Sequence, residues 1–137
     1  MVKKVLVGGV YNLVHKGHEL FLNKAKELGD YLVVVVASNR TASLTKKYPV
    51  LDAKTRKKNI EKLGIADKVV IGDEKDFIKV VRREKPNVIA LGYDQKISEK
   101  ELRKLLSKEG IDCEIVRIKE ELRGYKTSKI MKRNLKK

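Results

Sequence analysis

Five short apolar runs recur along the chain, and each is bounded by glycine or by polar residues. Continuous apolar runs of this length are typical of strands that are buried on both faces of a sheet. The sequence therefore predicts strands at residues 5–7, 32–37, 68–71, 87–91 and 114–118. The first of these runs ends at Gly8 and Gly9, where the chain is expected to leave the sheet.

Amphipathic segments separate the apolar runs. Apolar side chains recur at spacings of three and four residues from Phe21 to Leu28, as expected for one buried face of a helix. Ser98, with Glu101 three residues later, forms a capping-box pattern that opens a further helix. The helices predicted in this way cover residues 18–29, 53–63, 76–84 and 98–110.

The order of these elements predicts the fold class. Strand and helix alternate, which favours parallel strands joined by right-handed helical crossovers. We therefore expect an α/β fold: a Rossmann-like parallel sheet of five strands with helices on both faces, in a single domain spanning residues 1–137. Ligands of such open sheets bind beyond the carboxyl ends of the strands.

The charge of the chain indicates the kind of partner. Its 137 residues include 33 Lys and Arg against 18 Asp and Glu, a formal net charge of +15. The excess of basic residues is +5 in residues 1–50, +4 in residues 51–100 and +6 in residues 101–137. An even distribution favours a basic globular domain with anion sites over a nucleic-acid-binding arm.

The number of cysteines and the length of the apolar runs indicate the cellular compartment of the protein. The single cysteine, Cys113, excludes an intramolecular disulfide framework and is expected to be a small buried residue in a strand. The longest apolar run, residues 32–37, is too short to span a bilayer. We therefore expect a cytoplasmic protein without a membrane partner.

The segment that follows the first strand contains the candidate chemistry. It reads G-G-V-Y-N-L-V-H-K-G-H over residues 8–18. Glycines allow a bulky anion to approach the backbone, and the start of a helix offers N–H groups and positive potential. His15 and His18 are spaced so that both can face one phosphate.

Other interpretations of this segment fit less well. Neither the dinucleotide fingerprint G-x-G-x-x-G nor the P-loop G-x-x-x-x-G-K-S/T is present. A zinc site needs three or four ligands, whereas the chain has two histidines and one distant cysteine. Two purely structural histidines remain an alternative, although both histidines of the chain fall within four residues at a strand-to-helix turn.

H-x-G-H after a glycine-ended first strand resembles the cytidylyltransferase-like nucleotidyltransferases. Three more segments fall where that family keeps its motifs: Arg56, L-G-Y-D-Q at residues 91–95, and G-Y-K-T-S at residues 124–128. Within the family, the small size and the L-G-x-D-Q segment are most similar to archaeal FAD synthases.

The resemblance implies a role for each matching residue. His15 and His18 would contact the nucleotide phosphates and stabilise the transition state, and Lys46 or Lys47 would reach the phosphates from the other side, with Lys46 as the catalytic candidate. Arg56 would bind phosphate, and the segment with Gly92 and Asp94 would border the nucleoside. The full set of implied nucleotide-binding residues is Gly9, Val10, Tyr11, His15, His18, Arg56, Gly92, Asp94, Gln95, Gly124, Tyr125, Thr127 and Ser128.

The chain departs from the family pattern at three positions. Asn12 stands where the family usually has aspartate, and Lys126 stands where its last motif usually has serine. Arg123 directly precedes Gly124, whereas related cytidylyltransferases place an arginine three residues before that glycine. A contact that depends on the usual aspartate is therefore not implied, and Lys126 would add a cation to the phosphate site.

The resemblance implies transfer of AMP from ATP to FMN, which gives FAD and pyrophosphate, with Mg²⁺ or another divalent cation as cofactor and a homodimer as assembly. No protein metal ligands are predicted. A glycerol-3-phosphate cytidylyltransferase that uses CTP is the first alternative. A basic RNA-binding domain is the second, but five tyrosines, two phenylalanines and no recognisable RNA-binding motif give it little support.

Overall fold

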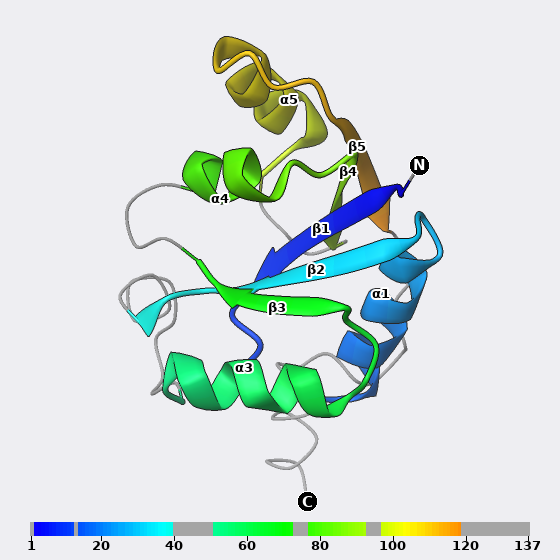
Figure 1. The fold of residues 1–137 in the computed structure, drawn as a ribbon, viewed down its shortest axis with the longest axis vertical. Helices are drawn as coiled ribbons and strands as arrows, with labels where there is room; N and C mark the ends of the chain where they lie inside the picture. The colour runs from blue at the N-terminus through cyan, green and yellow to red at the C-terminus, as the bar shows by residue number, and fades with distance from the viewer. Residues whose placement is uncertain (1, 13, 40–50, 73–76, 93–96, 119–137) are drawn as a thin grey trace, which may run out of the picture.

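The computed structural model describes residues 2–12, 14–39, 51–72, 77–92 and 97–118. Strands and helices alternate through these residues (Figure 1). In chain order they are β1 (Lys4–Gly9), α1 (Lys16–Lys26), β2 (Tyr31–Val36), α3 (Ala53–Lys62), β3 (Lys68–Ile71), α4 (Phe77–Glu84), β4 (Val88–Gly92), α5 (Glu99–Lys108) and β5 (Glu114–Ile118). The predicted α/β fold with five strands is confirmed.

The five strands form one parallel sheet in the order β3-β2-β1-β4-β5. The chain builds outward from β1 through β2 to β3, and then continues on the other side of β1 with β4 and β5. The crossing between β1 and β4 is the topological switch point, where open α/β sheets bind their ligands.

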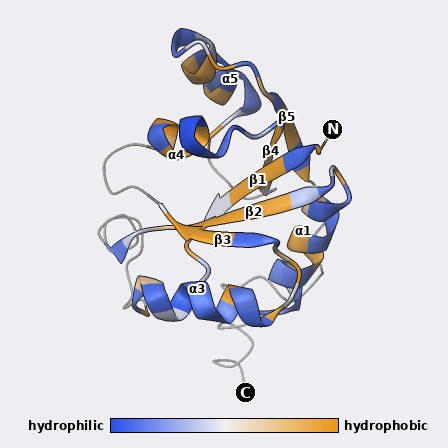
Figure 2. Cartoon of the chain, viewed as in Figure 1, coloured by the Kyte–Doolittle hydropathy of each residue, from blue (hydrophilic) through white to orange (hydrophobic). Residues whose placement is uncertain are grey.

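Helices cover both faces of the sheet (Figure 1). Successive strand residues alternate between faces, so Val5 and Val7 pack with Leu22 of α1 and Ile60 of α3, whereas Leu6 packs in the cluster of α4 and α5. The strands are apolar through most of their length, and the helices carry polar residues on their outer sides (Figure 2). Burial on both faces explains why the strands read as continuous apolar runs.

Helix α1 differs from the sequence prediction at its start. It begins at Lys16 rather than at His18, because the side chain of His15 provides the N-cap. The helix also ends earlier than predicted, at Lys26 with Glu27 as its C-cap. Gly29 follows in the turn to β2, where a Cβ would lie 2.5 Å from the carbonyl oxygen of Lys3 and 2.8 Å from Cγ2 of Val5. A side chain at position 29 would therefore push the end of α1 away from β1.

Among the described residues, no helix is both long and apolar enough to cross a membrane.

Candidate active site

The turn that leaves β1 at the switch point has an unusual backbone. Tyr11 has φ 54°, in the left-handed region that a bulky residue adopts only at a cost. Its ring is buried and lies on Gly9, where a Cβ would come within 3.0 Å of ring atoms Cε2 and Cζ. Glycine at position 9 therefore makes room for Tyr11, in addition to any ligand that approaches the strand end.

Tyr11 also connects the turn to the histidine pair. Its ring packs edge-on against that of His18, with the ring centroids 5.5 Å apart and the planes at 72°. The rings of His15 and His18 are stacked, with centroids 4.0 Å apart and planes at 29°. The structure thus brings together three of the residues that the sequence assigned to nucleotide binding.

The two imidazoles form a reciprocal cap on the first turn of α1. Nδ1 of His15 accepts a hydrogen bond from the backbone N–H of Gly17 at 3.0 Å. Nδ1 of His18 accepts one from the backbone N–H of His15 at 3.3 Å. This is the capping box usually made by Ser or Thr with Glu, built here from two histidines. Each cap satisfies a helix-end N–H group and fixes the orientation of a ring.

The cap also determines where the ring protons lie. An imidazole nitrogen that accepts a hydrogen bond carries no proton, so the proton of each neutral ring is on Nε2. Burial lowers the pKa of His15, which favours its neutral form at neutral pH. Two charged rings stacked at this distance would also repel each other. The pair can therefore supply two oriented Nε2–H donors, which is chemistry suited to an oxyanion.

Arg56 holds the turn to α3 from inside the protein. The side chain is fully buried, and burial lowers its pKa. Its Nη1 donates to the carbonyl oxygen of Val10 at 2.9 Å, and its Nε donates to that of Leu51 at 2.7 Å. Nη2 donates to Oδ1 of Asn39 at 3.4 Å. All three guanidinium nitrogens thus have protein acceptors, and the predicted phosphate contact of Arg56 stays a prediction.

Asn12 makes a second link between the same segments. Its Oδ1 accepts a hydrogen bond from the backbone N–H of Leu51 at 2.7 Å, across 39 positions of sequence. Asn39 completes the network, since it accepts from the backbone N–H of Ala53 and donates to Asp52, the N-cap of α3. The hydrogen bond from Asn39 and a second from the backbone of Lys54 lower the pKa of the Asp52 carboxyl. Sequence reasoning did not identify Asn39, because its partners lie far along the chain.

Gly92 ends β4, beside β1 at the carboxyl edge of the sheet. It is thus placed at the same edge as the histidine turn. The remaining predicted site residues lie outside the described part of the chain, and their roles stay predictions: Lys46, Lys47, Asp94, Gln95, Gly124, Tyr125, Thr127 and Ser128. Lys126 and Arg123 fall there as well.

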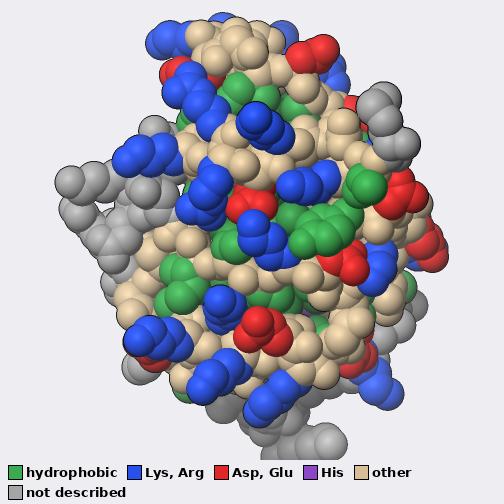
Figure 3. Space-filling view, in the orientation of Figure 1, with side chains coloured by type: hydrophobic (Ala, Val, Ile, Leu, Met, Phe, Trp, Pro, Cys, Tyr) green, Lys and Arg blue, Asp and Glu red, His purple; other side chains and the backbone are tan. Residues whose placement is uncertain are grey.

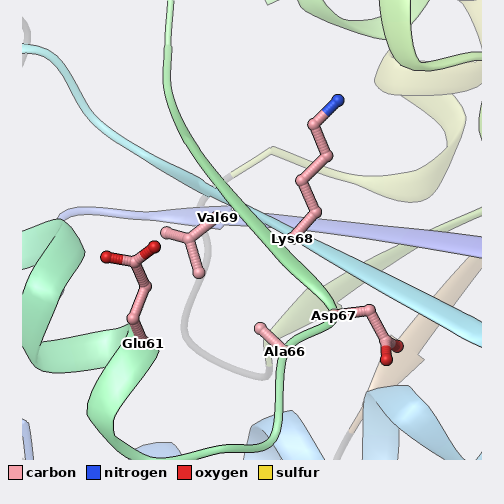
Figure 4. Close-up of a pocket in the computed structure, with 5 residues that line it drawn as sticks. All are labelled: Glu61, Ala66, Asp67, Lys68 and Val69. Carbon is pink, nitrogen blue, oxygen red and sulfur yellow. The ribbon is translucent and has the colours of Figure 1, made fainter.

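A different region contains a surface hollow of about 360 Å³ lined by Glu61, Ala66, Asp67, Lys68 and Val69 (Figure 4). It lies at the first residues of β3, the edge of the sheet opposite the histidine turn. The side chains of Asp67 and Lys68 point away from Glu61 rather than toward a common point (Figure 4). The hollow therefore offers no converging groups for catalysis.

Cys113 differs from its prediction. It is half-buried and precedes β5 instead of lying in the strand. Burial raises the pKa of its thiol to about 11, so the reactive thiolate is scarce at neutral pH.

On the face shown in Figure 3, the Lys and Arg side chains are scattered over the surface and do not form a single basic patch. Net charge would thus attract anions to the molecule as a whole.

Comparison with known proteins gives consistent matches over nearly the whole chain. An FAD synthase of Ferroglobus placidus is 42% identical over 134 residues, which cover 96% of this chain and 88% of the relative. An FAD synthase of Thermoplasma volcanium is 44% identical and covers 84% of this chain and 81% of the relative. A crystal structure described as the lipopolysaccharide core biosynthesis protein of Thermoplasma volcanium superposes with a TM-score of 0.85 at 41% identity, and covers 89% of this chain and all of that one.

The family assignment follows from the extent of these matches. The family model described as cytidylyltransferase-like matches residues 6–133, which include both histidines and, apart from the first two residues of β1, all of the described strands. The resemblance seen in the sequence is thereby confirmed, and the chain belongs to the cytidylyltransferase-like family.

Proposed function

We propose that this chain is an FAD synthase, which transfers AMP from ATP to FMN and releases pyrophosphate. The observation that carries the proposal is the reciprocal cap of His15 and His18 at the switch point of the sheet. The archaeal FAD synthases that are more than 40% identical over most of the chain support FMN as the acceptor.

The bond changes require charge stabilisation more than acid–base chemistry. An oxygen of the FMN phosphate attacks the α-phosphorus of ATP, a new P–O bond forms, and the bond to the β-phosphate oxygen breaks. A phosphomonoester has a second pKa of about 6, so the nucleophile is already ionised at neutral pH. The site therefore has to align the two phosphates and stabilise the charge that grows on the transferred group and on pyrophosphate.

The histidine pair suits this task. Each ring is fixed through Nδ1 by a backbone hydrogen bond, so each Nε2–H is oriented before the substrate arrives. Preorganised donors stabilise a developing oxyanion without the cost of reorganisation. Thr127, Ser128 and Lys46 are proposed to contact the β- and γ-phosphates, and Asp94 with Gln95 to border the nucleoside.

The divalent cation of the proposed reaction would accompany the nucleotide substrate. Within the described residues, no three or more His, Cys, Asp or Glu side chains form a group that could hold a metal. Mg²⁺ is commonly bound by substrate phosphates, water and one or two carboxylates rather than by a dedicated protein cage. We propose that the divalent cation arrives with ATP as MgATP, held mainly by the substrate phosphates.

The proposal is tested by incubating the purified protein with MgATP and FMN and measuring FAD by chromatography and pyrophosphate by a coupled assay. We expect both products in equal amounts. A parallel reaction with CTP and glycerol 3-phosphate distinguishes the principal alternative: pyrophosphate from that pair alone would reject FAD synthesis. The homodimer implied by the resemblance stays a prediction, which light scattering of the purified protein tests.

A further inference from the structure

Tyr11 is held in a backbone conformation that a bulky residue adopts only at a cost. Of the described residues other than glycine, Tyr11 and Lys85 are the two with a positive φ, at 54° and 51°. Such strain persists only where the surrounding structure enforces it, and it is concentrated at functional sites. Tyr11 lies in the turn between β1 and the histidine pair, so we examined what its strained conformation places there.

Both neighbours of Tyr11 are fixed by long-range hydrogen bonds. The carbonyl oxygen of Val10 accepts from Nη1 of Arg56 at 2.9 Å. Oδ1 of Asn12 accepts from the backbone N–H of Leu51 at 2.7 Å. Relaxation of Tyr11 toward an ordinary φ would disturb these two contacts. The turn therefore directs the Tyr11 side chain into one position.

The Tyr11 ring occupies a place in the core. The residue is 6% exposed and belongs to the apolar cluster that includes Val7 and Leu22. The ring lies so close to Gly9 that a Cβ there would come within 3.0 Å of two ring atoms. A ring buried in this way cannot stack on a nucleobase in this conformation. Its influence on a bound substrate would therefore pass through a protein group that it contacts.

The contact that relates Tyr11 to the reaction is His18. The two rings are packed edge-on, with centroids 5.5 Å apart and planes at 72°, a favourable geometry for aromatic pairs. His15 is stacked on the same imidazole, with planes at 29°. The hydrogen bond from the backbone of His15 to Nδ1 of His18 is long, at 3.3 Å, and a single contact leaves a ring free to tilt. One nearly parallel and one nearly perpendicular ring together limit that tilt.

The tilt of the imidazole decides where its donor points. Nδ1 of His18 accepts from the backbone, so the proton of the neutral ring lies on Nε2. A donor stabilises a transition state only if it is directed at the atom where charge develops, and a displacement of about 1 Å can cost about 10²-fold in rate. The Tyr11 ring is thus placed to set the direction of this donor without touching the substrate.

We propose that Tyr11 is a positioning residue, which holds the imidazole of His18 so that its Nε2–H is directed at the transferred phosphate. This inference rests on the proposed function for the reaction. It gives the Tyr11 ring an indirect role, which differs from the nucleotide contact implied by the family resemblance. The strained backbone directs the ring, and Gly9 leaves room for it.

A second tyrosine provides a matched control. Tyr11→Leu removes the ring but keeps an apolar side chain, and Tyr11→Phe keeps the ring. Tyr31 begins β2 and packs against the cluster on the other face of the sheet, with Nζ of Lys4 at 5.6 Å from its ring centroid. Tyr31→Leu therefore makes the same substitution away from the histidines.

The first experiment measures kcat and the KM values for ATP and FMN. For Tyr11→Leu we expect kcat to fall about tenfold while both KM values stay within about threefold, because the donor acts mainly in the transition state. Tyr11→Phe should stay within about twofold of the wild type, and Tyr31→Leu should match it. A kcat of Tyr11→Leu equal to that of Tyr31→Leu would overturn the inference.

A double-mutant cycle tests whether Tyr11 acts through His18. His18→Asn removes the Nε2–H donor, so no donor remains for Tyr11 to direct. In this background Tyr11→Leu should lower kcat by less than about twofold, against about tenfold in the wild type. An equal loss in both backgrounds would contradict the inference. If Tyr11→Leu does not fold, Tyr11→Met replaces it, because the unbranched methionine side chain fills irregular core space.

Nitrogen NMR of the imidazoles tests the positioning without substrates. The chain has two histidines, and His15→Asn assigns their signals. We expect the Nε2–H tautomer of His18 in the wild type, Tyr11→Phe and Tyr31→Leu, and a mixture of tautomers in Tyr11→Leu as the ring tilts away from the His15 N–H. An unchanged tautomer in Tyr11→Leu would also overturn the inference. If the tautomer changes as expected but the wild type makes no FAD, the proposed function fails while the placement of His18 by Tyr11 stands.

Discussion

The guanidinium of Arg56 donates a hydrogen bond to the carbonyl oxygen of Val10 at 2.9 Å and thereby joins the middle of α3 to the turn that follows β1. The same side chain reaches Leu51, which is also held by Asn12 of that turn. Residues 10–12 are thus connected with Leu51 in two ways: directly by the hydrogen bond to Asn12, and indirectly through Arg56, which donates to both Val10 and Leu51. Tyr11 holds a strained backbone conformation in this turn. The long-range contacts therefore keep in place a turn that its own backbone does not favour.

Replacing Arg56 should therefore destabilise the protein. In Arg56→Met, the carbonyls of Val10 and Leu51 lose a buried donor, and we expect the free energy of unfolding to fall by about 2–6 kcal/mol, at about 1–3 kcal/mol for each orphaned group. Urea unfolding measures the change. Lys58→Met, on the exposed side of the same helix, is the control and should stay within about 0.5 kcal/mol of the wild type. An equal effect of the two variants would show that the buried contacts contribute little.

The roles of the two nitrogens of His18 can be separated by substitution. His18→Asn places an amide oxygen near the position of Nδ1, so it can still accept from the backbone N–H of His15, but it removes the Nε2–H donor. We expect turnover to fall about 10²-fold or more, the scale for loss of one preorganised oxyanion donor, with little change in thermal stability. His18→Ala should lower turnover similarly and also reduce stability. Turnover of His18→Asn within a few-fold of the wild type would remove this imidazole from the catalytic groups.

The neutral state of His15 predicts a dependence of stability on pH. Burial lowers its pKa in the folded protein below the ordinary value of 6.5 that the unfolded chain retains. Between these two pKa values the unfolded chain binds more protons, so stability rises with pH. The contribution of the neutral cap is thus fully present above pH 6.5 and is lost as the pH falls through the lowered pKa.

This dependence is measured by urea unfolding at a series of pH values from about 8 to about 5, compared with His15→Asn. Asparagine is a good N-cap and does not titrate, so the variant should keep α1 and show a smaller decrease in stability over this range. The carboxyl of Asp52 has a pKa lowered from 3.8, so its contribution is lost only at lower pH. Identical pH profiles for the two proteins would show that His15 does not titrate differently in the folded state.

The sheet could be predicted from the sequence because burial on both faces makes its strands read as apolar runs. Observed and predicted bounds agree for residues 68–71 and 114–118, and the other strands shift by a residue or two. The start of α1 was wrong by two positions, since histidine is not among the residues that usually cap helices. The spacing of three between His15 and His18 was the available signal, because it equals the spacing of a capping box.

The supporting residues of the site could not be predicted in the same way. Arg56 and its neighbouring lysines look like a basic helix face in the sequence, yet its side chain is fully buried. Arg56 lies 46 positions from Val10, and Asn12 lies 39 positions from Leu51. Such pairs depend on which strands become neighbours, and local periodicity contains no information about that choice. Motif positions therefore identified the histidines and Arg56 as site residues, but not the buried contacts by which Arg56 and its neighbours hold the turn in place.

The departure at Asn12 leads to the last prediction. The family usually has aspartate at this position, and either side chain has an oxygen that can accept from the backbone N–H of Leu51. Asn12→Asp should therefore keep the free energy of unfolding within about 0.5 kcal/mol, whereas Asn12→Ala leaves that N–H without its acceptor and should cost about 1 kcal/mol or more. Urea unfolding of both variants, with FAD formation as a second readout, measures the difference. If Asn12→Asp were as unstable as Asn12→Ala, the amide itself, rather than an acceptor oxygen, would be what this turn requires.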